Sequence, residues 1–377
     1  MKIQRSTRCT LKFSNAAKLS KLDAVLKEYG RVVNRFIDLF WLNCPHKNDL
    51  LKPIVDSVET WFSARLRKVA AREAIDLIQS SKQRDGDAAV KPHHKSDRMH
   101  VSSTIASLKP SKTKEFDCWF HLRSICPLKN KLIIDFPIKL HKHFHQLAQR
   151  GKRLESYIIT KEYIQFCFEI ETGPKKEKNA CIGIDTGINA LASTSTGEQF
   201  GTDVKQYIER INRRQHGSKG QQRASRQLRQ YMNEIAKRIC AEASLIVVEN
   251  LKNITINTKR RLVKNTRRSI GRWNVRYWLS RLQMTCEDTN VSFRIVSPWK
   301  TSQRCSVCGH TDRRNRNAEK FVCRECGHSD NSDLNAATNI LNRFLTGKYG
   351  SGCKPLNRPI VPTQMVQPSV SEQNGRF

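Results

Sequence analysis

Residues 243–251 read ASLIVVENL and contain the clearest strand signal in the second half of the chain. The continuous apolar run from Leu245 to Val248 is bounded by polar residues, which is typical of a strand buried on both faces. Glu249 follows at the carboxyl end of that strand. In open α/β sheets this edge is where ligands bind, although a solvated strand-end glutamate is an equally simple interpretation of the residue taken alone.

A second carboxylate, Asp185, lies in the segment 180–201, which reads ACIGIDTGINALASTSTGEQFG. Ile182 and Ile184 lead into it as a buried strand, and a short hairpin is expected after Gly187. A carboxylate in that setting is unfavourable unless it is paired or binds a cation. An ordinary turn aspartate is the alternative for this pattern by itself.

A third carboxylate, Asp333, stands at the start of a predicted helix in the segment 328–344, HSDNSDLNAATNILNRF. The apolar face of that helix runs through Ala336, Ile340 and Phe344 at helical spacing. Aspartate at a helix start often serves only as an N-cap, so an N-cap is the simpler interpretation of Asp333 taken alone.

The order of elements around these carboxylates favours one architecture. The chain runs through a strand, a hairpin, basic helices, a buried strand, a helix, a strand over 292–297 and a final helix, which is the order of an RNase H-like fold. In that fold Asp185, Glu249 and Asp333 would meet at one edge of the sheet. Three acidic groups so close repel one another unless divalent cations neutralise them, and two Mg²⁺ ions would suit phosphodiester hydrolysis.

Four cysteines form another constellation in the same region. Two CxxC pairs, separated by fourteen residues, are formed by Cys305, Cys308, Cys323 and Cys326. Each pair can aim two thiolates at one tetrahedral ion, and the glycine after each pair permits the turn. Four thiolates leave no open position, so we expect one structural Zn²⁺ in a ribbon over 303–328 rather than a catalytic zinc. The other nine cysteines are scattered singly and are expected to act as small buried or semi-buried hydrophobic residues.

The first half of the chain predicts a small β-barrel interrupted by helices. Residues 2–13 have the pattern of a strand, and 16–81 carry apolar residues at the three- and four-residue spacings of helices. A polar stretch over 82–100 is expected to be a loop whose histidines are solvated rather than metal ligands. From 117 to 171 the pattern is β-like and includes a hairpin that turns near Thr160.

The net charge of the chain indicates which class of molecule it binds. The 377 residues carry 68 Lys and Arg against 34 Asp and Glu, which gives a formal charge of +34. This excess suits a polyanion, and nucleic acid is favoured over a membrane surface or an acidic protein because no amphipathic membrane-lying helix stands out. Hydrophobic residues make up 38% of the chain, too many for a disordered basic tail, and no apolar run is long enough for a membrane span or a signal peptide.

Twenty of the basic residues flank Glu249 in two segments, 205–238 and 250–286. The second segment interleaves aromatic residues with arginines, which suits phosphate contact and stacking, although packing in the core explains Trp273 and Tyr277 more simply. The residues expected to contact nucleic acid are Arg213, Arg214, Arg226, Arg229, Lys259, Arg260, Arg261, Arg267, Arg268 and Arg272.

Four motifs resemble the RuvC and zinc-ribbon signatures of TnpB proteins, the transposon-encoded nucleases related to compact type V CRISPR effectors. They are GIDTGINALAST, LIVVENL, TSQRCSVCGH…CRECGH and SDLNAATNI, and they cover about 179–345. The resemblance implies RNA-guided, Mg²⁺-dependent cleavage of double-stranded DNA, with the target selected by guide RNA pairing and a short flanking motif. It also implies that Asp185, Glu249 and Asp333 bind two Mg²⁺ ions and that the four CxxC cysteines bind one Zn²⁺. One departure is Ser332, which stands where the family pattern has Arg or Ala.

With this resemblance, the sequence predicts an α+β multidomain protein in which an RNase H-like (RuvC) α/β nuclease domain contains the inserted zinc ribbon. Its predicted parts are the first strand of a wedge-like barrel (1–14), a helical recognition lobe (15–110), the remainder of the barrel (111–178), the nuclease domain (179–345) and a disordered tail (346–377). We expect a cytoplasmic, nucleoid-associated protein of a prokaryotic host, without a membrane partner.

Two other functions stay open at this point. One is an RNA-guided DNA-binding repressor with little nuclease activity, against which the three intact carboxylates argue. The other is a DNA-strand-transfer transposase that acts without RNA. The motifs suit a transposon nuclease and a CRISPR effector equally, and no pattern indicates an oligomeric state.

Overall fold

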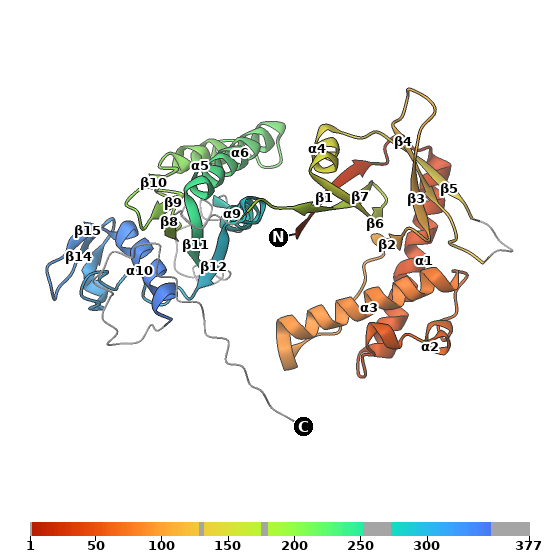
Figure 1. The fold of residues 1–377 in the computed structure, drawn as a ribbon, viewed down its shortest axis with the longest axis horizontal. Helices are drawn as coiled ribbons and strands as arrows, with labels where there is room; N and C mark the ends of the chain where they lie inside the picture. The colour runs from red at the N-terminus through yellow and green to blue at the C-terminus, as the bar shows by residue number, and fades with distance from the viewer. Residues whose placement is uncertain (1, 128–131, 175–179, 252–272, 348–377) are drawn as a thin grey trace. The chain divides into compact units, whose positions relative to one another are not determined.

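The chain divides into two compact units, Lys2–Glu171 and a second unit that begins at Thr172 (Figure 1). The computed structural model describes residues 2–127, 132–174, 180–251 and 273–347. Each unit has a hydrophobic core of its own. No helix in the described ranges is both long enough and apolar enough to cross a membrane.

Two antiparallel sheets form the strand part of the first unit. One sheet has the order β1 (Lys2–Thr10), β7 (Tyr163–Glu171), β6 (Gly151–Thr160) and β2 (Arg98–Ser102). The other consists of β3 (Ala106–Pro110), β4 (Cys118–Leu122) and β5 (Ile134–Ile138). The hairpin predicted near Thr160 is confirmed by β6 and β7, and every second residue of β7 is buried, as expected for a strand with one face against a core.

Two long helices, α1 (Ala16–Phe40) and α3 (Ala64–Asp85), pack against each other in the same unit, and α2 (Lys52–Asp56) packs against α3. Each long helix starts at a side-chain cap, because Asn15 and Ser63 accept hydrogen bonds from backbone N–H groups of the first turn. Gly30 of α1 faces the segment before β2, where a Cβ atom would overlap the side chain of Ser96, so only glycine permits this approach.

The sequence prediction for this unit was incomplete in three places. Helix α3 continues to Asp85, strands β2 and β3 occupy residues 98–110 at the end of the predicted helical lobe, and helix α4 (Lys142–Arg150) interrupts the predicted β-like segment. The missed elements are five to nine residues long. Such short segments contain too few repeats for a period of 2 to be separated from one of 3.6.

The expectation of solvated histidines is wrong for His94. Its side chain is buried, and its Nε2 atom lies 3.5 Å from the Oε1 atom of Glu73, a buried carboxylate of α3. Tyr29 of α1 donates a 2.7 Å hydrogen bond to the other oxygen of Glu73. The carboxylate that accompanies the histidine therefore comes from a different element, which no local pattern indicates.

The second unit is built on one sheet of five strands, β10 (Gln199–Phe200), β9 (Ala192–Thr194), β8 (Ala180–Asp185), β11 (Ala243–Glu249) and β12 (Ser292–Val296), in that spatial order. Strand β11 is parallel to both β8 and β12, and β9 is antiparallel to β8. Among the described residues of this unit, the α-helices are α5 (Val204–Asn212), α6 (Lys219–Glu242), α9 (Val275–Thr289) and α10 (Ser332–Thr346). This order of elements agrees with the prediction.

Strand β11 is covered on both faces, as its continuous apolar run predicts. Ile246 and Val248 belong to the core that α5, α6 and α9 share with the sheet. Leu245 and Val247 pack in a smaller cluster with Ile340 of α10 on the opposite face. The sheet is thus enclosed between helices, and its carboxyl-terminal edge brings Asp185 and Glu249 to adjacent strand ends.

Candidate functional site

Asp185 and Glu249 end two neighbouring parallel strands. The register pairs Ile184 of β8 with Val248 of β11, so each carboxylate follows directly after a paired residue. Because parallel strands have their carboxyl ends at the same edge of a sheet, the two side chains start from adjacent positions. The sheet order thus brings together two carboxylates that lie far apart in the sequence.

Asp333 reaches the same region from helix α10. The N-cap of this helix is Asn331, whose Oδ1 accepts hydrogen bonds from the N–H groups of Asp333 and Leu334 at 2.9 and 3.4 Å. The N-cap interpretation of Asp333 is therefore wrong, and its carboxylate is available for other partners. A Cβ atom on Gly187, two residues after Asp185, would lie 3.8 Å from the Oδ2 atom of Asp333, so the loop after β8 passes beside this carboxylate.

Asp185 is affected electrostatically by the other two carboxylates. Burial raises the pKa of Asp185 to about 7, with further contributions from the negative charges of Glu249 and Asp333. Burial also raises the pKa of Glu249, against the opposing effects of a hydrogen bond from Thr301 and the positive charge of Arg343. A cation that bound here would relieve this repulsion, and an all-oxygen set of carboxylates is the donor chemistry that Mg²⁺ prefers.

Two residues that the sequence did not single out contact these carboxylates. A guanidinium N–H of Arg316, which starts the short strand β13 (Arg316–Asn317), donates a 2.9 Å hydrogen bond to Asp333. The hydroxyl of Thr301 donates to Glu249. Neither residue type is diagnostic of a carboxylate site, and both lie between β12 and α10, so a single sequence offers no local signal for them.

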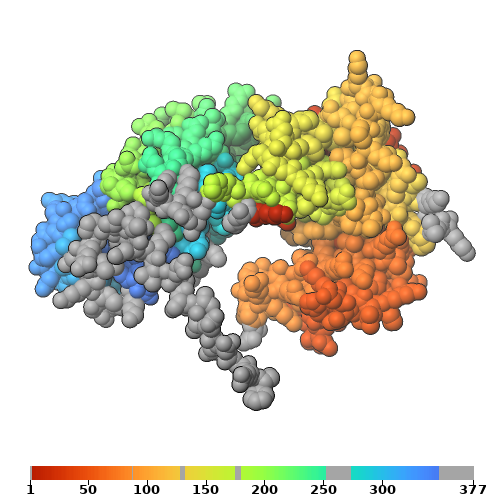
Figure 2. Space-filling view, viewed as in Figure 1, coloured from red at the N-terminus to blue at the C-terminus, as the bar shows by residue number. Residues whose placement is uncertain are grey.

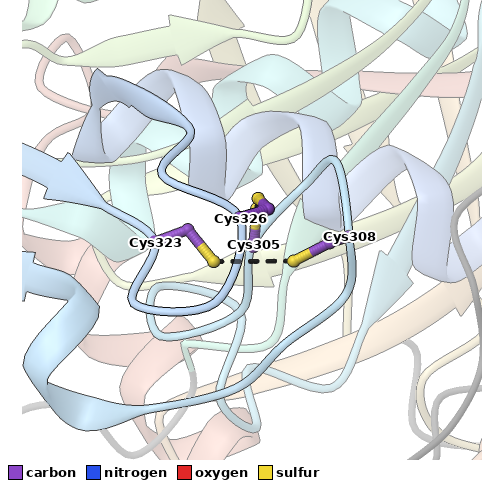
Figure 3. A group of neighbouring side chains, drawn as sticks. All are labelled: Cys305, Cys308, Cys323 and Cys326. Carbon is purple, nitrogen blue, oxygen red and sulfur yellow. Dashed lines mark hydrogen bonds between the residues drawn. The ribbon is translucent and has the colours of Figure 1, made fainter.

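The four predicted zinc ligands come together in the ribbon (Figure 3). The Sγ atoms of Cys308 and Cys323 are 3.5 Å apart, those of Cys305 and Cys326 are 3.8 Å apart, and all four lie within 4.8 Å of one another. Four sulfur atoms at Zn–S distances of about 2.3 Å would be separated by roughly 3.8 Å. The cluster could therefore hold a metal ion, and its geometry is consistent with zinc.

Among the described residues, one group of three or more His, Cys, Asp or Glu side chains has all its possible ligand atoms within 4.8 Å of one another, and it consists of these four cysteines. The oxygens of the three carboxylates do not all lie within the same 4.8 Å of one another.

Two similar turns hold the cysteines. Cys305 N–H donates to the carbonyl of His310, and Cys323 N–H donates to the carbonyl of His328, both at 2.8 Å. The glycine that follows each pair has a positive φ, 79° at Gly309 and 71° at Gly327, as the sequence pattern predicts.

The ribbon is joined directly to the start of α10. Ser332 donates from its backbone N–H to the carbonyl of Glu319 and from its hydroxyl to the carbonyl of Ala318, each at 2.8 Å. Both carbonyls lie between the ribbon strands β13 and β14 (Lys320–Val322). Ser332, the residue that departs from the family pattern, therefore ties the ribbon hairpin to the start of α10, directly before Asp333.

The basic residues predicted on α5 and α6 are at the surface. Arg213, Arg214, Arg226 and Arg229 are all exposed, on or next to helices that form part of the outer surface of the second unit (green in Figure 2). The guanidinium of Arg229 lies over the ring of Tyr277. The other predicted contacts, Lys259, Arg260, Arg261, Arg267, Arg268 and Arg272, lie outside the described residues.

The aromatic residues of the second basic segment pack inside the unit. Trp273 is buried, and Tyr277 donates a 2.9 Å hydrogen bond from its hydroxyl to Asn233 of α6. The packing interpretation of these side chains is therefore confirmed.

The cysteines that are scattered singly along the chain also behave as expected, because all eight that the structure describes are buried or partly buried.

Comparisons with known proteins agree with the motifs. The family described as "Cas12f1-like, TNB domain" matches residues 277–340. InsQ of Escherichia coli (strain K12), which is named as an RNA-guided DNA endonuclease, is 28% identical over 247 residues, a region that covers 55% of this chain and 60% of InsQ. The chain is thus similar to somewhat less than two thirds of that relative's length.

The fold is similar to that of a solved compact effector. The structure of a Cas12f1–sgRNA–target DNA complex aligns with a TM-score of 0.53 and 13% identity, over 87% of this chain and 83% of that one. These comparisons agree with the likeness that the motifs predict: the chain is similar in sequence to the Cas12f1-like TNB family and to InsQ, and similar in fold to Cas12f1.

Proposed function

We propose that this chain is an RNA-guided DNA endonuclease that hydrolyses phosphodiester bonds at Asp185, Glu249 and Asp333. The observation that carries the proposal is the approach of these three carboxylates to one edge of the sheet, where the charges of Glu249 and Asp333 add to burial in raising the pKa of Asp185. The similarity to InsQ, which is named as an RNA-guided DNA endonuclease, supports the reaction class.

The chemistry follows from the residues that meet at the sheet edge. Asp185 and Glu249 would present carboxylate oxygens from two strand ends, and Asp333 would add a third from α10. When bound, two Mg²⁺ ions would activate a water molecule and stabilise the leaving oxygen of the phosphodiester. Arg316 holds the carboxylate of Asp333 and offsets part of the negative charge of the group.

The choice of target would rest on guide RNA pairing together with a short flanking motif. Guide RNA pairing would select the DNA strand, while the protein would read a short flanking motif and hold the nucleic acid by its phosphates. The exposed arginines of the α5–α6 region are suited to such sequence-independent contacts. The Cas12f1 structure similar in fold is itself a complex with sgRNA and target DNA.

The test is cleavage by the purified protein with its co-purified RNA. We expect a discrete RNA, and Mg²⁺-dependent cutting of a DNA library that carries the matching target beside randomised flanks. Asp185→Ala should abolish cleavage while target binding persists, and the matched surface variant Glu234→Ala should cut like the unaltered chain.

Three outcomes separate the proposal from its alternatives. A guided complex that binds its target but never cuts in Mg²⁺ would identify a repressor. Strand transfer without any bound RNA would identify a transposase. Cleavage that survives Asp185→Ala would contradict the assignment of the site.

A further inference from the structure

Thr301 lies between the sheet and the zinc ribbon, in the loop that follows β12. Its side chain is buried, with 3% exposed, and its hydroxyl donates to the Oε1 atom of Glu249. A hydroxyl has a single hydrogen to donate, and of the two acceptors here the carboxylate of Glu249 is closer than the carbonyl of Pro298, which lies at 3.2 Å. Its use on one oxygen orients the carboxylate of Glu249 and leaves the remaining lone pairs of that group free for another partner.

Helix α10 holds the backbone around Thr301 in place. The side-chain amide of Asn339 donates to the carbonyls of Thr301 and Arg304 at 3.1 and 2.7 Å. Asn335 donates to the carbonyl of Arg304 at 2.8 Å and accepts from the N–H of Ser306 at 2.9 Å. Both asparagines are almost completely buried, so these hydrogen bonds are shielded from competition with water.

Arg343 secures the start of the same loop. Its guanidinium donates to the carbonyl of Trp299 at 2.6 Å and also to that of Ser297, and its side chain is only 6% exposed. The loop from Ser297 to Ser306 is therefore attached to α10 at several points along its length. Since α10 also carries Asp333, one helix sets the positions of both Asp333 and the group that orients Glu249.

We propose that Thr301 is a positioning residue that holds the carboxylate of Glu249 in its cation-binding orientation, and that Asn339 ties it to α10. The inference rests on the proposed function, because it concerns the same carboxylates. It extends that function because it assigns the loop from Ser297 to Ser306 a role in positioning the carboxylates. Partners that orient metal ligands in this way typically change metal affinity by 10–100-fold when they are removed.

The test compares three single variants of the full chain with its co-purified RNA. Thr301→Val removes the hydroxyl at almost constant shape, Thr301→Ser keeps it, and Thr285→Val removes a buried hydroxyl that donates 2.8 Å to a carbonyl of its own helix, α9. We expect Thr301→Val to raise the Mg²⁺ concentration for half-maximal cleavage by about 10-fold. Thr301→Ser should restore the original value, and Thr285→Val should leave it unchanged.

A second readout does not depend on cleavage. Mn²⁺ binding is followed by electron paramagnetic resonance, and binding at this site is the difference between each chain and the same chain carrying Asp185→Ala. Thr301→Val should weaken that component by a similar factor, with rescue by Thr301→Ser. Unaltered Mn²⁺ binding in Thr301→Val, or equal weakening in Thr301→Ser, would overturn the role of Thr301. Normal Mn²⁺ binding by the unaltered chain without any guided cleavage would instead contradict the proposed function.

Discussion

At the scale of a single residue, burial makes the charged form of Asp185 unfavourable in the folded protein, although the proposed function uses that charge to bind a cation. Its carboxyl has a pKa of about 7 in the folded, metal-free protein, against 3.8 for an ordinary aspartate. The folded state therefore holds this proton more tightly than the unfolded state does. The stability that this provides is fully present below about pH 4 and is lost as the pH rises through 7.

The consequence is a pH-dependent unfolding transition. From pH 4 to pH 8 the second unit should lose on the order of 4 kcal/mol of unfolding free energy through Asp185 in the absence of divalent cations. Asp185→Asn should remove most of this dependence and stabilise the metal-free protein at pH 8, because the amide carries no charge. Thermal melts at several pH values in a chelating buffer measure both effects. A melting temperature for Asp185→Asn that follows the unaltered chain across this range would contradict the assignment.

The individual site residues differ in how far the sequence could predict them. Asp185 and Glu249 could be anticipated because apolar strands lead directly into them, and the cysteines because their spacing is itself the signal. Arg316 and Thr301 could not, because their contacts with Asp333 and Glu249 depend on how the segment between β12 and α10 folds back. The prediction for His94 failed for the same reason, since its neighbour Glu73 belongs to another element.

At the scale of elements, the fit between β8 and α10 depends on Gly183. A Cβ atom there would overlap the carbonyl oxygen of Ala337 and would lie 2.8 Å from the Cβ atom of Leu341. The first of these atoms is helix backbone, which cannot move aside without displacing α10 from the sheet. A glycine within a strand predicts such a close approach, but not the element that makes it.

Gly183→Ala should therefore push α10, the helix that carries Asp333, away from the strand that carries Asp185. We expect the unfolding free energy to fall by about 3 kcal/mol, as in overpacked cores, and cleavage to be abolished because the carboxylates no longer meet. Gly173→Ala is the matched control, because a Cβ atom there meets nothing within 4 Å. Thermal melts and cleavage assays on both variants test this. A Gly183→Ala chain that melts and cuts normally would show that β8 and α10 do not need this approach.

The ribbon is the second element whose integrity the site requires. Cys308→Ser should reduce the bound zinc from one ion per chain to a small fraction, since a structural zinc site depends on all four ligands. Because Arg316 and the carbonyls that bind Ser332 belong to the ribbon, we expect cleavage to fall together with zinc content.

Elemental analysis and cleavage rates measure the two quantities on the same preparations. Cys44→Ser, which alters a partly buried cysteine of the other unit, should retain both. Full cleavage by a zinc-free Cys308→Ser chain would show that the ribbon does not support the carboxylates.

At the scale of the whole molecule, the question is whether the charge of +34 acts globally or through particular surfaces. Replacing Arg213, Arg214, Arg226 and Arg229 by Gln removes four exposed cations from the α5–α6 region. If each contacts a phosphate, the slope of log K against log salt concentration for RNA binding should fall by about 3, since each contact contributes roughly 0.7 on a single strand.

A control quartet removes the same charge from elsewhere. Lys27, Lys47, Arg84 and Lys91 each form an ion pair with an aspartate of the first unit. Their replacement by Gln lowers the net charge equally but removes cations that are already neutralised locally, so the salt slope should change by less than about 1. Filter binding of the co-purified RNA across a salt series measures both slopes. Equal slopes for the two quartets would mean that the charge acts as a general field and that the α5–α6 surface has no special part in holding RNA.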